Sequence, residues 1–121
     1  MRPTSFLPLV AALACGACAA ETDERPAEFA YIAKAILEPS CATAVCHSAQ
    51  TAAEGLDFSS VAAARATFQD NAFVTVPDEP ANNRIIFILR TSGEERMPVD
   101  SPMPDADVAL IEAWIAAGAV Y

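Results

Sequence analysis

The chain has 121 residues, of which seven are Lys or Arg and sixteen are Asp or Glu, so its formal net charge is −9 at pH 7. A chain of this length has room for one modest hydrophobic core and for no second domain. The excess of negative charge argues against nucleic acid or an anionic membrane surface as the main partner. It favours a partner protein with a basic docking face.

Residues 1–20 have the layout of a secretory signal peptide. The basic residue Arg2 is followed by an apolar stretch from Phe6 to Ala14 and then by small residues. This apolar stretch is too short and too interrupted for a transmembrane helix. Cleavage after Ala19 or Ala20 would fit the small residues there, and it predicts export to the periplasm.

Two cysteines in the same segment offer an alternative form of processing. Lipoprotein processing at Cys15 or Cys18 would leave a diacylated cysteine that anchors the protein to the cell envelope. Soluble signal peptides seldom need cysteines at such positions, so the sequence favours the lipoprotein. If the signal is removed as a whole, both cysteines are merely small residues without a role.

The mature part of the chain begins with a short charged tether, residues 21–27, followed by one domain over residues 28–121. Apolar residues recur at three- and four-residue steps at Phe29, Ile32 and Ile36. This spacing predicts a first amphipathic helix, and Pro39 predicts its end.

The run CATAVCH places two thiols and one imidazole close together, at Cys41, Cys46 and His47. Residues five apart on a helix lie about 140° from each other around its axis, at roughly 100° per residue. The two cysteines therefore cannot share one helical face, and residues 42–45 are expected to bulge as a loop. Two thiols that add to the vinyl groups of a haem, beside a histidine that reaches its iron, are what covalent haem attachment requires.

Three further elements follow in the predicted domain. Ser59 or Ser60 can cap a helix through VAAARATF, after a turn at residues 55–57. Residues 84–90 (RIIFILR) have the β-branched composition of a strand, although an asparagine at 82 or 83 could cap a helix there. The last segment has Val108, Ile111 and Ile115 on one face, which predicts a closing helix.

The residue types present in the chain limit which side chain could be the second axial ligand of a haem iron, opposite His47. His47 is the only histidine, so a second histidine ligand within the chain is excluded. A methionine is the obvious donor, and beyond Met1 the chain has only Met97 and Met103, each followed by proline. Either could also simply fill space in a core.

The order of these segments resembles a small bacterial c-type cytochrome domain of the CxxxxCH variety, found in exported proteins and lipoproteins. The resemblance covers about residues 28–121. It depends on the following segments in this order: CATAVCH, GLDFSS, the turn at Val76 and Pro77 with PANNRIIFIL, RMP, and ALIEAWIAAGA.

This resemblance implies an all-α fold, a cytochrome c-like domain of about four short helices around one covalently bound haem c. It implies a helix at RIIFILR and a last helix that packs across the first. Cys41 and Cys46 would form the thioethers, His47 would bind the iron on the proximal side and Met97 on the distal side. Met103 falls where the family has an apolar residue and ranks second. The implied function is one-electron transfer to a redox partner protein, without enzymatic turnover.

Two other interpretations of the cysteines are kept. Cys41 and Cys46 could close a disulfide in a haem-free structural or interaction lipoprotein domain, since oxidation is expected outside the cytoplasm. That interpretation leaves the Met-Pro segment and His47 without a role. Zinc would find three ligands in this motif but no apparent fourth.

Overall fold

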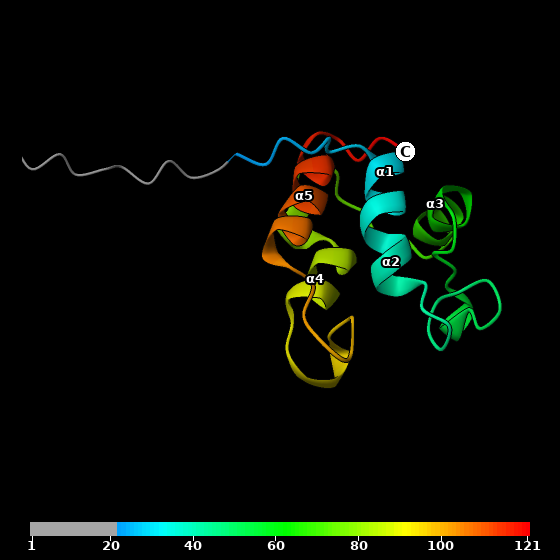
Figure 1. Ribbon diagram of the computed structural model, residues 1–121. Coiled ribbons are helices and arrows are strands. Elements are labelled where there is room, and N and C mark those ends of the chain that lie inside the picture. Colours follow the sequence, from blue (N-terminus) through cyan, green and yellow to red (C-terminus); the bar gives the residue numbers. More distant parts are fainter. Residues whose placement is uncertain (1–21) are drawn as a thin grey trace, which may run out of the picture.

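The computed structural model describes residues 22–121, and these residues form helices and no strand, so the all-α prediction is confirmed for them. The longer elements are α1 (Phe29–Ile32), η1 (Ala33–Leu37), α2 (Glu38–Cys41), α3 (Val61–Asp70), α4 (Arg84–Arg90) and α5 (Asp105–Ala116) (Figure 1). Three single turns, η2 (Ala53–Gly55), η3 (Pro80–Asn82) and η4 (Gly93–Glu95), lie in the connections. The first three elements form one continuous helix, which gives the four helices expected from the sequence.

The prediction that the first helix ends at Pro39 is wrong, because helical structure continues to Cys41. Proline has no N–H to donate to the carbonyl four residues earlier, which normally breaks an α-helix. Here the turn before it, η1, is a π-helix, in which the N–H of Glu38 donates to the carbonyl of Ala33, five residues back. This local widening lets the helix pass the proline and places Cys41 at its C-terminus.

The helices α3 and α4 begin close to where the sequence placed them. The Ser60 hydroxyl accepts a hydrogen bond from the N–H of Ala63 and caps α3, as predicted. Asn83 occupies the N-cap position of α4, but its side chain does not cap that helix. It is fully buried instead and bonds the preceding loop, accepting from the N–H groups of Thr75 and Val76.

A cluster of aromatic rings forms the centre of the core where α5 packs against α1. The ring of Phe29 lies 5.2 Å from that of Trp114 and 5.4 Å from that of Phe68. The Trp114 Nε1–H donates to the carbonyl of Val120 at 2.8 Å, which holds the C-terminal residues over this cluster. Trp114 is therefore a core residue, and the first and last helices are in contact, as the family resemblance implied.

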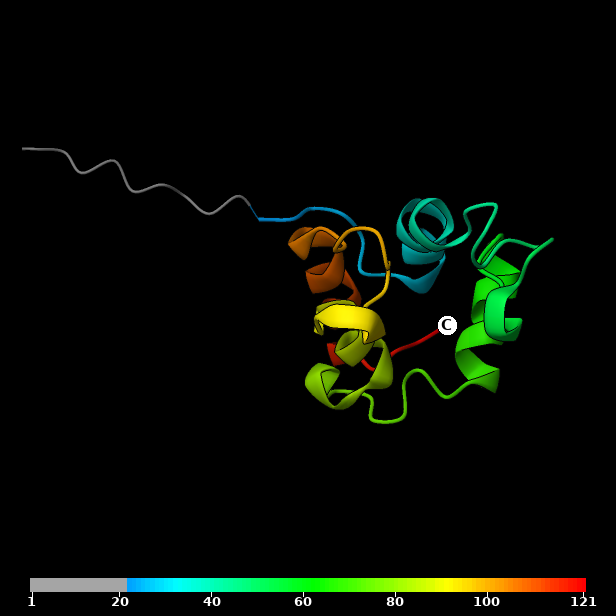
Figure 2. The same cartoon turned by 90° about the horizontal axis from the view of Figure 1, so that it is seen from below.

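The first helix lies between two groups of elements. Figure 1 shows α4 and α5 on one side of it and α3 on the other, and the view from below agrees (Figure 2). The loop after α2 and the loop between α4 and α5 lie at the same end of the molecule (Figure 1). Residues 22–28 and the C-terminus lie at the other end.

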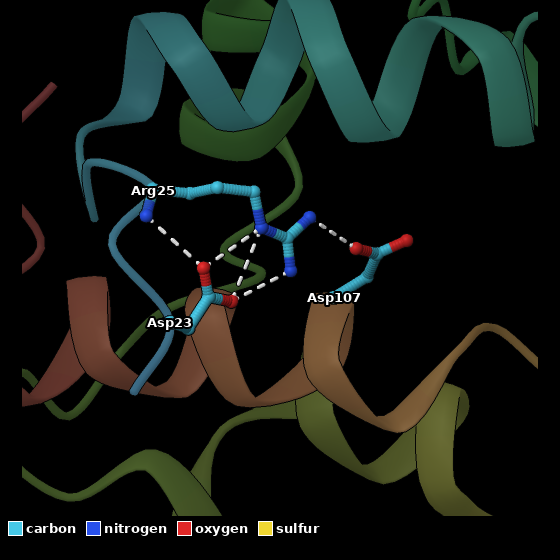
Figure 3. A network of polar contacts seen from close by, with 3 residues as sticks. All are labelled: Asp23, Arg25 and Asp107. Carbon is cyan, nitrogen blue, oxygen red and sulfur yellow. Dashed lines mark hydrogen bonds and ion pairs between the residues drawn. The ribbon is translucent and has the colours of Figure 1, made fainter. Parts of the chain in front are cut away.

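The N-terminal tether is held against α5 by one ion pair, and a second ion pair lies within the tether. The Arg25 guanidinium lies 2.6 Å from a carboxylate oxygen of Asp107 in the first turn of α5, and 2.7 Å from Asp23 (Figure 3). Hydrogen bonds from Arg25 lower the pKa of the Asp23 carboxyl. Residues 22–27 contain no helix, and these contacts fix the direction in which the chain enters the domain.

Candidate functional site

The loop between Cys41 and His47 is bulged as the spacing predicted. The N–H of His47 donates to the carbonyl of Cys41 at 3.1 Å, and the N–H of Cys46 donates to the carbonyl of Thr43 at 3.0 Å. Val45, at the outside of this loop, is 83% exposed. The loop therefore returns to the end of α2, and Cys41, Cys46 and His47 line one cavity. Cys46 and His47 lie in hydrogen-bonded turns and not in a helix.

The His47 side chain is held on two sides. Its Nδ1 lies 3.0 Å from the carbonyl oxygen of Ala53, and because a carbonyl can only accept, Nδ1 carries the proton. The ring of Phe58 packs edge to face against the imidazole, with ring centroids 5.5 Å apart. The main-chain N–H of Phe58 donates to the main-chain carbonyl of His47. The second ring nitrogen, Nε2, therefore keeps its lone pair for a Lewis acid.

A sharp turn places the Ala53 carbonyl next to this ring. Ala52, Glu54 and Gly55 all have positive φ, at 38°, 56° and 75°. The N–H of Ala53 donates to the carbonyl of Cys46 at 3.0 Å. One residue thus bonds both the main chain of Cys46, through its N–H, and the ring of His47, through its carbonyl.

His47 is one of the residues that line an apolar cavity of about 660 Å³. Its wall is mainly hydrophobic and comes from the first helix, the turn after η2, the loop before α4, and α4 itself: Leu37, Leu56, Phe58, Phe73, Ile85 and Ile88. A second, smaller cavity of about 350 Å³ adjoins the Cys41–His47 loop. Cys41, His47 and Met97 line both cavities, and Cys46 lines the second.

The two methionines have different environments. Met97 is 36% exposed, lines the cavity with His47, and is tied to α4 by a 2.9 Å hydrogen bond from its N–H to the Ile88 carbonyl. Met103 is 5% exposed and belongs to the hydrophobic core. The structure brings Met97, and not Met103, to the cavity that His47 lines.

The cysteines differ in their electrostatic setting. Burial, and to a lesser degree the charge of Cys46, raises the pKa of the Cys41 thiol to about 12. Within residues 22–121 neither cysteine forms a disulfide. In the same part of the chain no group of three or more His, Cys, Asp and Glu side chains could hold a metal ion, so the zinc interpretation finds no ligand set there.

Several residues that shape this site were not predicted from the sequence. Phe58 and Phe73 line the cavity with His47, and nothing local in the sequence indicated this. Arg84 lies at the cavity with its guanidinium 5.3 Å from the centroid of the Phe73 ring. The carbonyl that holds His47 could not be named from sequence, although the Gly55 turn was the available signal.

Comparisons with known proteins do not assign this chain to a family. Searches against models of protein families, against curated proteins and against solved structures found no match. Cys15 and Cys18, the two candidate lipidation sites, lie outside the described residues. None of the helices in residues 22–121 is long and apolar enough to cross a membrane.

Proposed function

We propose that this chain is a c-type cytochrome domain that carries one electron at a time. One haem c would be attached through thioethers to Cys41 and Cys46, with His47 Nε2 and Met97 as the axial ligands of its iron. The observation that carries the proposal is the apolar cavity that Cys41, His47 and Met97 line together. Residues from the end of the first helix, the following loop and the α4–α5 connection meet there.

The residues present fit such a group in chemistry and in size. An imidazole whose Nδ1–H is bound to a carbonyl presents a neutral nitrogen donor, and a thioether is a soft donor, which together are a known axial pair for haem iron. The cavity of about 660 Å³ is within the range of roughly 300–1,000 Å³ that small-molecule and cofactor sites occupy. Its hydrophobic wall suits an apolar macrocycle.

When bound, haem supplies an iron that exchanges one electron. The protein's part is to hold the two ligands, exclude water and set the potential. The hydrogen bond to Ala53 holds the His47 ring in one tautomer and makes its Nε2 a better donor. The apolar side chains of Phe58, Phe73 and Leu56 line the cavity and would keep water away from a bound haem. A thioether ligand favours the reduced iron, so His/Met ligation raises the potential relative to two nitrogen ligands.

The remaining parts of the proposal concern location and partners. With both axial positions filled and no acid–base group assigned a role, we propose a carrier and not an enzyme. Residues 26–121 contain five Lys or Arg and thirteen Asp or Glu, a net charge of −8, so we propose a redox partner protein with a basic docking face. We place the protein in the periplasm, soluble or lipid-anchored through Cys15 or Cys18.

The experiment is to express the full chain for export in a host with cytochrome c maturation machinery. Intact mass and the reduced-minus-oxidised visible spectrum are then measured before and after denaturation. We expect the mass of one haem to stay with the denatured chain, together with sharp reduced bands. The matched control, Cys41→Ser with Cys46→Ser, should lose all haem on denaturation. A wild-type mass lower by two hydrogens, without visible absorbance, would replace the proposal by a Cys41–Cys46 disulfide.

A further inference from the structure

The side chain of Arg96 reaches past Met97 to the main chain beyond it. Its Nε lies 3.4 Å from the carbonyl oxygen of Pro98, and its Nη2 lies 3.3 Å from the carbonyl oxygen of Val99. A guanidinium only donates and a carbonyl only accepts, so both contacts are hydrogen bonds from Arg96. The Arg96 side chain is half-buried and closes a loop around Met97.

The two sides of Met97 are held in different ways. On the N-terminal side the main chain is tied to the rest of the fold, because the Met97 N–H donates to Ile88 and the Arg96 N–H donates to Gly93. On the C-terminal side, the bonds from Arg96 are the only ones that the carbonyls of Pro98 and Val99 receive within residues 22–121. Val99 is 66% exposed and adds little packing. Among the hydrogen bonds within residues 22–121, those from the Arg96 side chain are therefore the ones that close this loop.

We propose that Arg96 is a positioning residue, which holds the loop around Met97 closed and so keeps the Met97 sulfur at the cavity that His47 lines. This inference rests on the proposed function, in which that sulfur is an axial ligand. The forked guanidinium is suited to the task because it bonds two neighbouring carbonyls with one rigid group. Without the Arg96 side chain, the loop around Met97 opens more often. An external ligand then competes more easily with the Met97 sulfur for the haem iron.

The first test follows the loop itself and does not need electron transfer. Amide hydrogen exchange is measured on the purified full chain and on its Arg96→Gln variant. We expect the amide of Met97, whose N–H donates to the Ile88 carbonyl, to exchange at least about fivefold faster in the variant, with little change in α5. The control is Arg65→Gln, which removes the same charge from an exposed position on α3. Unchanged exchange of the Met97 amide would overturn the proposal.

The second test asks whether the loop governs the ligand. Imidazole is titrated into the oxidised, haem-loaded protein, and loss of the long-wavelength sulfur-to-iron band reports displacement of Met97. We expect half-displacement in Arg96→Gln at about one tenth of the wild-type imidazole concentration, a shift of ~1.4 kcal/mol. Arg65→Gln should behave as wild type. An unchanged midpoint in Arg96→Gln would overturn the proposal.

A third variant separates the forked hydrogen bonds from the charge. Arg96→Lys keeps the positive charge, but a single ammonium on a flexible stem does not reproduce the fork. We expect the imidazole concentration that half-displaces Met97 in Arg96→Lys to lie closer to the value for Arg96→Gln than to the wild-type value. A wild-type midpoint would show that charge alone matters and would reject the positioning role. If the wild-type chain retains no haem at all, the proposed function fails, whereas the exchange experiment still decides whether Arg96 closes the loop.

Discussion

The carbonyl oxygen of Ala53 lies 3.0 Å from Nδ1 of His47, and the residues on both sides of this carbonyl have left-handed backbone. Ala52 has φ 38° and ψ 54°, and Glu54 has φ 56° and ψ 22°. For residues with a Cβ this conformation costs roughly 1–2 kcal/mol each. The turn is kept in place by its hydrogen bonds to Cys46 and His47, so part of the folding free energy is used to orient the imidazole.

Replacing the strained residues with glycine is expected to stabilise the fold. Ala52→Gly should raise the free energy of unfolding by about 0.5–1 kcal/mol, because glycine adopts positive φ without the Cβ penalty. The opposite kind of change, Gly55→Ala, should lower the free energy of unfolding by about 1 kcal/mol, because Gly55 has φ 75°. No neighbouring atom would contact the new Cβ, so this loss would come from the backbone conformation alone. Urea denaturation measures both. Equal stability of the two variants would contradict the assignment of strain to this turn.

The two methionines are expected to respond in opposite ways to truncation. Met97→Ala should abolish the sulfur-to-iron band of the oxidised, haem-loaded protein and change the stability of the fold little, because Met97 is partly exposed. Met103→Ala should keep the band but cost about 2–5 kcal/mol, the usual range for a buried methionine. Absorption spectra and thermal denaturation of both variants distinguish the roles. A lost band in Met103→Ala alone would reverse the distal assignment.

The thiols of the haem-free chain are expected to differ in reactivity. Only the thiolate is alkylated, and burial raises the pKa of Cys41 to about 12, so this thiol stays protonated at pH 9. Iodoacetamide at pH 9 should therefore label Cys46 well before Cys41, and the labelling of Cys41 should accelerate as the pH rises towards 12. Peptide mass mapping gives both rates. In urea the two rates should become equal, and a persistent difference there would point to a cause other than burial.

The same pKa shift has a consequence for stability. In the unfolded chain the Cys41 thiol ionises near its ordinary value of 9.0, whereas in the folded chain it ionises near 12. The unfolded state therefore loses its proton first, and the haem-free fold should lose stability as the pH rises from about 9 to about 12. Cys41→Ser should remove this part of the loss. Equal pH dependence of the variant and the wild type would show that Cys41 is not its source.

Asn83 is expected to be essential for the loop before α4. Its amide accepts hydrogen bonds from the N–H groups of Thr75 and Val76 and donates to the carbonyls of Val76 and Glu79, all at 2.8–2.9 Å. Asn83→Ala would leave these partly buried main-chain groups unpaired and should cost about 3 kcal/mol or more. Asn82→Ala, one residue earlier and exposed, should cost less than about 1 kcal/mol. Similar losses in thermal denaturation would contradict this account.

Local sequence signals were sufficient where the physical cause is itself local. Ser60 caps α3, and the apolar spacing of Val108, Ile111 and Ile115 gives α5, because both depend on neighbours within a turn or two. The composition of Arg84–Arg90 did not separate helix from strand, and it was the family resemblance that favoured the helix that forms.

Local rules failed where a distant contact or an unusual backbone bond decided the outcome. Pro39 did not end the first helix, since the π-helical turn before it removes the conflict with the missing N–H. Asn83 has the residue type of a helix cap, yet the loop before α4 uses its side chain. No local pattern indicated a role for Arg96, whose side chain bonds the carbonyls two and three residues ahead once the loop bends.

The sequence by itself determined the chemistry that is available after the predicted signal segment: the thiols of Cys41 and Cys46, one imidazole and two Met-Pro methionines, with a cysteine spacing that forces a loop at residues 42–45. Only the tertiary structure decided how these groups meet. The two Met-Pro pairs are alike locally, but contacts between distant segments place Met97 at the cavity with His47 and bury Met103 in the core. Residue type and spacing act over a few bonds, whereas the cavity is made by segments that lie far apart along the chain.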